Sequence, residues 1–263
     1  MSTVTMQEVV DYWDRRPCNV KHGTAPIGTE EWSQQVTGRK YFVEPHIPGF
    51  ADFSKYVGKD VLEMGCGIGT DTLSFLQAGA RVDALDISEE SLSLAVRRCL
   101  KYVGHKAGER PTARFFAANI EDWYPGRRYD LVYSFGVLHH TLRPERALYH
   151  AYQALKPGGE LKIMLYSRYS WKNLFTLQQP EAQGGCPLAK TYSVHDAREM
   201  VWRAGFRAVL VKKAHIFPYR IKEYVKHEYK LAFPWNFIDP KKVEKYLGWH
   251  LLIHASRPIE WRF

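Results

Sequence analysis

The chain of 263 residues lacks most of the features that mark specialised classes of protein. Its 4 cysteines, Cys18, Cys66, Cys99 and Cys186, are widely separated and form no C-x-x-C pair. Neither a disulfide framework nor a zinc site is therefore indicated. No apolar run approaches the roughly 18 residues of a membrane span, and the first residues lack the basic and apolar regions of a signal peptide. We expect a cytoplasmic protein without a membrane span.

A short apolar run that breaks into three alternating glycines is the most informative feature present. Residues 61–64 predict a strand, and Gly65, Gly67 and Gly69 follow it. Glycine lets the backbone turn sharply and lets a ligand approach closely, and the helix that follows offers free N–H groups. The spacing differs from the dinucleotide pattern G-x-G-x-x-G, because Thr70 stands where the third glycine would be. No Gly-Lys-Ser/Thr follows, which excludes a P-loop.

A carboxylate at the end of the next predicted strand strengthens the interpretation of the glycine run as a cofactor site. Residues 81–86 predict a strand that ends in Asp86, where the hydroxyls of a ribose would lie across the strand tips. Together these motifs resemble the class I S-adenosylmethionine (SAM) dependent methyltransferases, particularly those similar to the ubiquinone and menaquinone biosynthetic enzymes. The matching segments occur in family order over about residues 55–165. They are the glycine segment 61–69, Ala84-Leu85-Asp86-Ile87-Ser88, residues 129–140 and Leu155-Lys156-Pro157-Gly158-Gly159.

The resemblance implies SAM as cofactor, S-adenosylhomocysteine as product, and a set of contact residues. Expected cofactor contacts are Glu63, Gly65, Cys66, Gly67, Gly69, Asp86, Ile87, Asn119, Ile120, Ser134, Phe135 and Gly136. The glycine loop would surround the methionine and ribose part, with Glu63 near the amino group. Asp86 would hold the ribose, and Ile87 would lie on the adenine. Many relatives have Asp where this chain has Asn119, an amide that both donates and accepts hydrogen bonds.

The order of predicted elements favours an α/β fold. Strand patterns occur at about 61–64, 81–86, 114–118, 129–134, 160–166, 207–213 and 249–255, with helical patterns between most of them. Such alternation predicts a Rossmann-like, mostly parallel seven-stranded sheet with helices on both faces. By resemblance, the last strand is antiparallel. One helix is predicted to begin at Ser88, with Leu100 on its apolar face and Arg98 on its polar face.

Residues 1–263 are interpreted as a single methyltransferase domain. It would comprise an N-terminal cap (1–55), a SAM-binding core (56–166), substrate-side additions with the sixth strand (167–246), and the last strand with the tail (247–263). Both additions are rich in aromatic residues, which would pack them onto the sheet or form a lid over the strand ends. The expected substrate contacts are Tyr12, Trp13, Arg16, Tyr41 and Tyr166.

Three histidines are candidates for removing a proton from the methyl acceptor. An unperturbed imidazole is half neutral near pH 6.5, as a general base requires. His139 and His140 follow the fourth strand, and His46 lies in the N-terminal part; a structural role for His139 and His140 at the turn is the alternative. No set of carboxylates is spaced like the magnesium site of catechol-type methyltransferases, so no metal is expected.

The sequence as a whole predicts transfer of a methyl group to an O, N or C atom of a small metabolite, anionic or aromatic. The net charge of +9 leaves an RNA or protein methyltransferase as the first alternative. Its lysines and arginines form no dense stripe, however, which argues against nucleic acid. A nicotinamide-dependent oxidoreductase is the second alternative. The sequence does not fix an oligomeric state.

Overall fold

The computed structural model describes residues 4–103, 112–124, 126–175, 186–217, 219–223, 228–231 and 233–259. Within these ranges, no helix combines the length and apolar character that crossing a membrane requires. Parts of the predicted additions, 176–185 and 224–227, and the tail 260–263 lie outside the described residues. The division of the chain into cap, core and additions stays a prediction.

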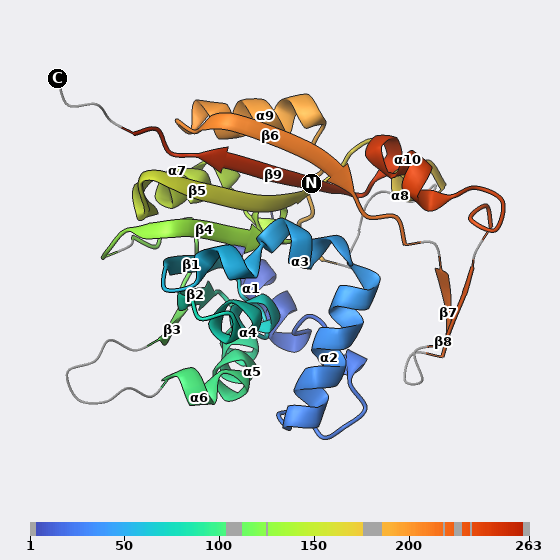
Figure 1. Ribbon diagram of the computed structural model, residues 1–263, viewed down its shortest axis with the longest axis horizontal. Coiled ribbons are helices and arrows are strands. Elements are labelled where there is room, and N and C mark those ends of the chain that lie inside the picture. Colours follow the sequence, from blue (N-terminus) through green and yellow to red (C-terminus); the bar gives the residue numbers. More distant parts are fainter. Residues whose placement is uncertain are drawn as a thin grey trace.

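Seven strands form the predicted sheet, in the order β3-β2-β1-β4-β5-β9-β6 (Figure 1). Strands β1 to β5 pair in parallel, and β9 lies antiparallel between β5 and β6. The α/β fold and the antiparallel last strand are thereby confirmed. The strands are β1 (Asp60–Met64), β2 (Arg81–Asp86), β3 (Ala113–Ala117), β4 (Tyr129–Phe135), β5 (Leu155–Tyr166), β6 (Arg207–Ala214) and β9 (His250–Ser256).

Helices cover both faces of the sheet because successive strand residues point to opposite sides. Val61 packs with Phe75 of α4 in one apolar cluster, whereas the next residue, Leu62, packs with Leu148 of α7 and Val201 of α9 in the other. The helices are α1 (Met6–Arg15), α2 (Glu30–Val43), α3 (His46–Ala51), α4 (Thr70–Gln77), α5 (Glu89–Arg98), α6 (Leu100–Val103), α7 (Pro144–Ala154), α8 (Trp171–Phe175), α9 (Val194–Arg203) and α10 (Pro240–Leu247). Short 3-10 turns cover Val20–His22, Phe53–Tyr56 and Leu138–His140.

The helix predicted after β2 begins at Ser88, whose hydroxyl accepts the N–H of Ser91. Two side-chain predictions for it are wrong. The helix breaks at Cys99, so Leu100 is 62% exposed instead of buried. Arg98 is only 8% exposed because α2 packs over it. Its guanidinium donates to Ser33 and Thr37 of α2 and to the Ile68 carbonyl, so it ties α2 to the glycine loop.

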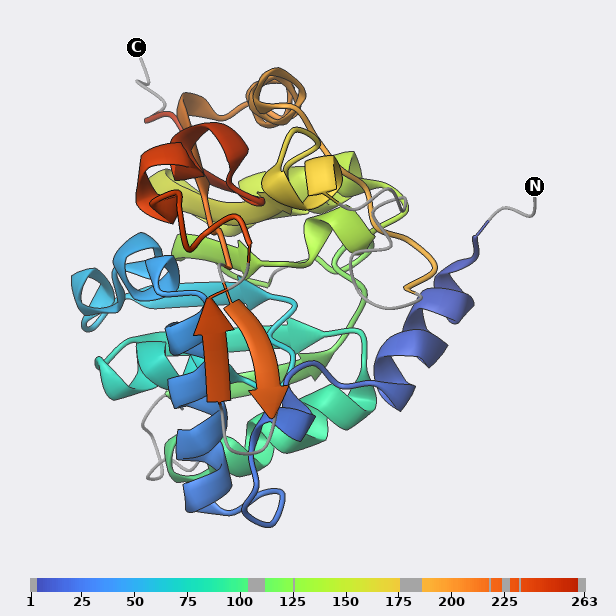
Figure 2. The same ribbon diagram turned by 90° about the vertical axis from the view of Figure 1, so that its right-hand side faces the viewer.

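The additions gather at the carboxyl ends of the parallel strands. Seen from that side, α1 and α2 lie on opposite sides of the strand ends, and a hairpin lies in front (Figure 2). The hairpin pairs β7 (Tyr219–Glu223) with β8 (Glu228–Leu231). It is a second, two-stranded sheet that the sequence patterns did not predict. Ligands bind at this edge in open α/β sheets, so these segments are placed to enclose one.

Candidate active site

The glycine loop after β1 takes a conformation that other residues adopt only with strain. Gly65, Gly67 and Gly69 have φ angles of +80°, +52° and +72°. A Cβ on Gly65 would lie 2.3 Å from the side chain of Val137, and one on Gly69 would lie 2.9 Å from the Cβ of Ala95. At Gly67, no atom of the described residues lies within 4 Å of such a Cβ. The outer glycines therefore serve packing, and the middle one leaves open space for a ligand.

Asp86 lies at the end of β2 and supports this loop. Its Oδ2 accepts the Gly67 N–H at 2.7 Å, and its Oδ1 accepts the Ser88 N–H at 2.9 Å. Burial raises the pKa of Asp86, whereas these amide hydrogen bonds act in the opposite direction. A carboxylate oxygen can accept a second hydrogen bond, so both oxygens keep lone pairs for a ligand. Asp86 thus joins the tips of two strands and remains an acceptor on the cavity wall.

One cavity of about 1070 Å³ runs from this loop to the additions. Most predicted cofactor residues line it: Glu63, Gly65, Cys66, Gly67, Asp86, Ile87, Asn119, Ile120, Phe135 and Gly136. Gly69 and Ser134 do not. The Ser134 hydroxyl is buried and donates to the Met64 carbonyl at 2.6 Å. The Asn119 amide is engaged in the turn after β3, where it accepts the Glu121 N–H and donates to Asp122.

A buried acidic pair lies beside the loop. Thr72 donates a hydrogen bond to Glu63, and burial together with the charge of Asp71 raises the pKa of Glu63 to about 8. Asp71 accepts hydrogen bonds from Lys40 and Tyr41, both at 3.0 Å. Glu63 lines the cavity, and the charge of Lys40 only partly offsets the rise in the pKa of Glu63. A ligand with an ammonium group would supply further positive charge and favour the ionised form.

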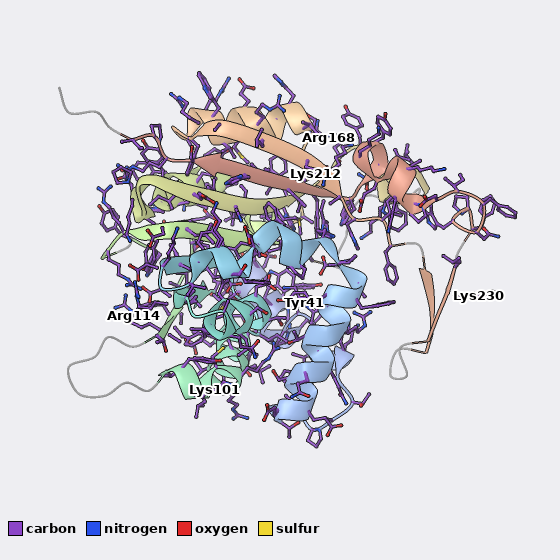
Figure 3. The ribbon with its side chains drawn as sticks, in the orientation of Figure 1. Tyr41, Lys101, Arg114, Arg168, Lys212 and Lys230 are labelled. Atoms are coloured by element: carbon purple, nitrogen blue, oxygen red, sulfur yellow. The ribbon has the colours of Figure 1, made fainter. Side chains whose placement is uncertain are left out.

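Of the five predicted substrate residues, Tyr41 is the one that does not line the cavity. It lies between α2 and α4 (Figure 3), where its hydroxyl contacts Asp71 and Ser74, and it is not part of the cavity wall. Tyr12, Trp13 and Arg16 line the cavity from α1 and its end, and so does Tyr166 from the end of β5. The rings of Tyr12 and Trp13 are 5.0 Å apart, and Trp13 packs edge-on to His140 at 5.1 Å.

The adjacent histidines after β4 occupy different environments. His139 is fully buried, packs against Tyr166 with ring centroids 3.7 Å apart and the planes tilted by 33°, and does not line the cavity. His140 lines the cavity, and its Nδ1 lies within hydrogen-bond distance of the Leu188 carbonyl. Its Nε2 has no partner among the described residues. Burial lowers the pKa of His140 to about 4, so the imidazole is neutral at pH 7.

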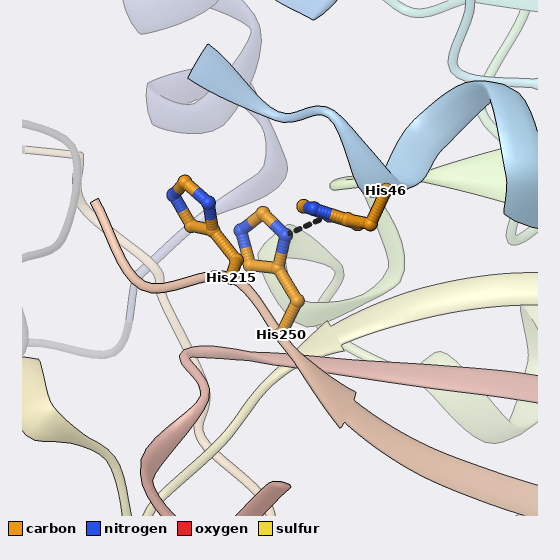
Figure 4. Close-up of side chains that lie close together, drawn as sticks. All are labelled: His46, His215 and His250. Atoms are coloured by element: carbon orange, nitrogen blue, oxygen red, sulfur yellow. Dashed lines mark hydrogen bonds between the residues drawn. The ribbon is translucent and has the colours of Figure 1, made fainter. Parts of the chain in front are cut away.

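His46 lies behind the cavity wall, where its Nε2 is 3.0 Å from Nδ1 of His250 (Figure 4). His250 and His215 line the cavity beside it. Neither was predicted as a site residue. His46 and His250 are separated by 204 positions, and only the folded sheet brings them together. No spacing in the sequence could have indicated this cluster.

Sequence comparison assigns the chain to a family. The family described as a methyltransferase domain matches residues 39–211. A tRNA U34 carboxymethyltransferase of Tolumonas auensis is 33% identical over 121 residues, 46% of this chain and 34% of that protein. Malonyl-[acyl-carrier protein] O-methyltransferase 2 of Ilyobacter polytropus is 28% identical over 122 residues, 46% of this chain and 43% of that protein. The chain spans less than half the length of these relatives.

Solved structures share the architecture over nearly the whole chain. The magnesium protoporphyrin IX methyltransferase of Synechocystis PCC 6803 with bound SAM has a TM-score of 0.58 at 16% identity, covering 98% of this chain and 100% of that one. The [4+2]-cyclase SpnF has a TM-score of 0.62 at 17% identity, covering 99% and 98%. At such identities the likeness concerns the fold alone. On the family match and this architecture, the chain belongs to the methyltransferase domain family and has the class I SAM-dependent methyltransferase fold.

Proposed function

We propose that this protein transfers the methyl group of SAM to an O, N or C atom of a small anionic or aromatic metabolite. The observation that carries the proposal is one continuous cavity of about 1070 Å³, which joins the glycine loop and Asp86 to the aromatic residues of α1. Volumes of this order suit small-molecule sites. A donor and a modest acceptor would occupy such a cavity together.

The cavity residues fit the donor. Gly67 leaves space at the loop, Asp86 offers two acceptor oxygens for a ribose diol, and the Ile87 side chain gives an apolar surface for adenine. Glu63 matches an ammonium group in charge. When bound, SAM supplies an electrophilic methyl on a sulfonium. The task left to the chain is to align the acceptor and exclude water, which is mainly a proximity effect.

The acceptor side supplies rings, a cation and a base. Tyr12, Trp13 and Tyr166 present aromatic faces, and Arg16 offers a cation for an anionic acceptor. His140 is our candidate for the proton acceptor because it is neutral and its Nε2 has no partner among the described residues. His139, which is outside the cavity wall, fits the structural role at the turn.

A polymer acceptor is the alternative that the tRNA-modifying relatives keep open. Binding along RNA requires cations in a row that follows the phosphates. The 37 lysines and arginines are spread along the sequence without a dense stripe. The match to a methyltransferase domain also disfavours the nicotinamide-dependent oxidoreductase.

Calorimetry with SAM, S-adenosylhomocysteine and NADH tests the donor directly. We expect binding of the first two and none of NADH. Tight NADH binding, or failure of the folded protein to bind either SAM or S-adenosylhomocysteine, would overturn the proposal.

A further inference from the structure

Three histidines from distant parts of the chain, one buried (His250) and two half-buried, meet at the acceptor end of the cavity (Figure 4). His46 begins α3, His215 follows β6, and His250 begins β9. One ring nitrogen of each histidine lies within 4.8 Å of a ring nitrogen of each of the other two. The His250 ring lies 5.6 Å from that of Phe135, a residue that also lines the cavity. The cluster is therefore adjacent to the expected site of methyl transfer.

The backbone at His215 is in a strained conformation, and hydrogen bonds to neighbouring segments maintain that conformation. Its φ is +71°, a left-handed conformation that is unfavourable for a non-glycine residue. Three hydrogen bonds fix it: its N–H donates to Glu244 at 2.7 Å, and its carbonyl accepts from the Trp249 N–H and the Trp171 indole. Such strain tends to occur at functional sites. Here it keeps the His215 ring stacked on His250, with centroids 4.4 Å apart.

The surroundings of His250 match those of a metal ligand in part, because one ring nitrogen is hydrogen-bonded to His46 and a carboxylate lies near the other, beyond hydrogen-bond distance. A ligating histidine commonly directs one ring nitrogen at the ion and the other at a carboxylate, which fixes the ring. His250 directs Nδ1 at Nε2 of His46, 3.0 Å away, and its Nε2 lies 3.7 Å from Oε1 of Glu44. Two imidazole nitrogens on one zinc ion at 2.0–2.1 Å are about 3.3 Å apart. The first pair is thus close to ligating separation.

We propose that His46, His215 and His250 bind one divalent transition-metal ion of the zinc type, with Glu44 orienting His250 and an open position facing the cavity. Three neutral imidazoles suit zinc and its neighbours rather than magnesium or calcium. The three nitrogens, which are at most 4.8 Å apart, would have to approach to about 3.3 Å from one another to share one ion. Lys172 also lines this part of the cavity and opposes a cation, and the Glu44 carboxylate offsets it.

The role of the open position rests on the proposed function. It would hold an oxygen or nitrogen atom of the methyl acceptor, since three protein ligands plus one exchangeable position are typical of catalytic zinc sites. Metal binding itself does not require SAM or an acceptor. The proposal departs from the sequence expectation of no metal, which considered carboxylates and cysteine spacing and not a histidine set.

The test is a metal titration of the full chain, with any affinity tag removed and metals stripped by a chelator. Co²⁺ is followed by its visible absorption, and Zn²⁺ by competition with a chromophoric chelator. We expect one ion per chain. His215→Gly removes a ligand while suiting the left-handed backbone, so the variant should fold and bind at least about a hundredfold more weakly. Glu44→Gln should weaken binding by about tenfold to a hundredfold.

His254→Ala is the matched control, because this histidine lies on the same strand but its Nε2 contacts Glu160 instead of the cluster. It should bind the ion as the unmodified chain does. Equal affinity in the unmodified chain and His215→Gly, or the absence of stoichiometric binding, would overturn the proposal. SAM binding, measured separately by calorimetry, tells failure of this inference apart from failure of the proposed function.

Discussion

Replacement of Asp86 by alanine is the sharpest test of the donor site. The carboxylate is positioned by the amides of Gly67 and Ser88, at 2.7 and 2.9 Å, and lines the cavity. A ribose diol would donate two further hydrogen bonds to it, each contributing on the order of 1.5–3 kcal/mol. Part of that energy is recovered in the variant, because water can accept from the released hydroxyls. We expect Asp86→Ala to weaken SAM binding by roughly tenfold to a thousandfold.

The variant also loses two contacts that hold the glycine loop, so stability must be measured beside affinity. Asp83 provides a matched control on the same strand. It is buried and accepts hydrogen bonds from Arg114, Arg127 and Tyr129, and it does not line the cavity. Asp83→Asn should lower the melting temperature while its folded fraction binds SAM as the unmodified chain does.

Calorimetry gives the Kd of each variant, and thermal melting gives its stability without ligand. Our reasoning is refuted if folded Asp86→Ala binds SAM with unchanged Kd. It is equally refuted if Asp83→Asn weakens SAM binding as much as Asp86→Ala does, because the effect would then reflect general loosening of β2.

Three further predictions concern the acceptor side and the fold. His140→Ala should lower the methylation rate by about 10²–10⁴ with SAM affinity nearly intact, and a parallel loss of thermal stability would show a structural role instead. Deleting the first 20 or so residues removes α1 and should abolish turnover more than it lowers the melting temperature; full activity of the truncated chain would exclude α1 from the site. Burial opposes ionisation of Glu160, but hydrogen bonds from Lys55 and Tyr56 hold its pKa at about 2. This lowered pKa stabilises the fold above about pH 4.5, and the contribution is lost as the pH falls toward 2. Urea unfolding at several pH values should therefore show a shallower acid decline in Glu160→Gln, and identical declines would contradict the assignment.

The parallel sheet could be predicted because its signals are local. Each strand is a short apolar run, and the glycines and Asp86 stand directly at strand ends, where topology brings them together. The start of α5 could be predicted in the same way, because Ser88 caps the helix by accepting the Ser91 N–H. The donor half of the cavity follows from these local patterns.

The acceptor half depends on packing between distant segments. A periodic pattern places Arg98 on a polar helix face, but α2 covers that face and supplies hydroxyl partners for the guanidinium. Tyr41 does not line the cavity because its hydroxyl donates a hydrogen bond to Asp71, which lies 30 positions away in the sequence. The cluster of His46, His215 and His250 depends on the insertion of β9 between β5 and β6. Single residues of this kind carry no local signal.

Incubation of the protein with methyl-labelled SAM and a cell extract, followed by separation into metabolite, RNA and protein fractions, tests the central claim most directly. A protein that grips RNA phosphates loses roughly 10³ or more in affinity between 50 and 200 mM salt, whereas a pocketed metabolite responds far less. We predict label in the low-molecular-weight fraction at about 150 mM salt, with only weak retention of RNA. Label that follows RNA or protein through gel filtration would contradict a small-molecule acceptor.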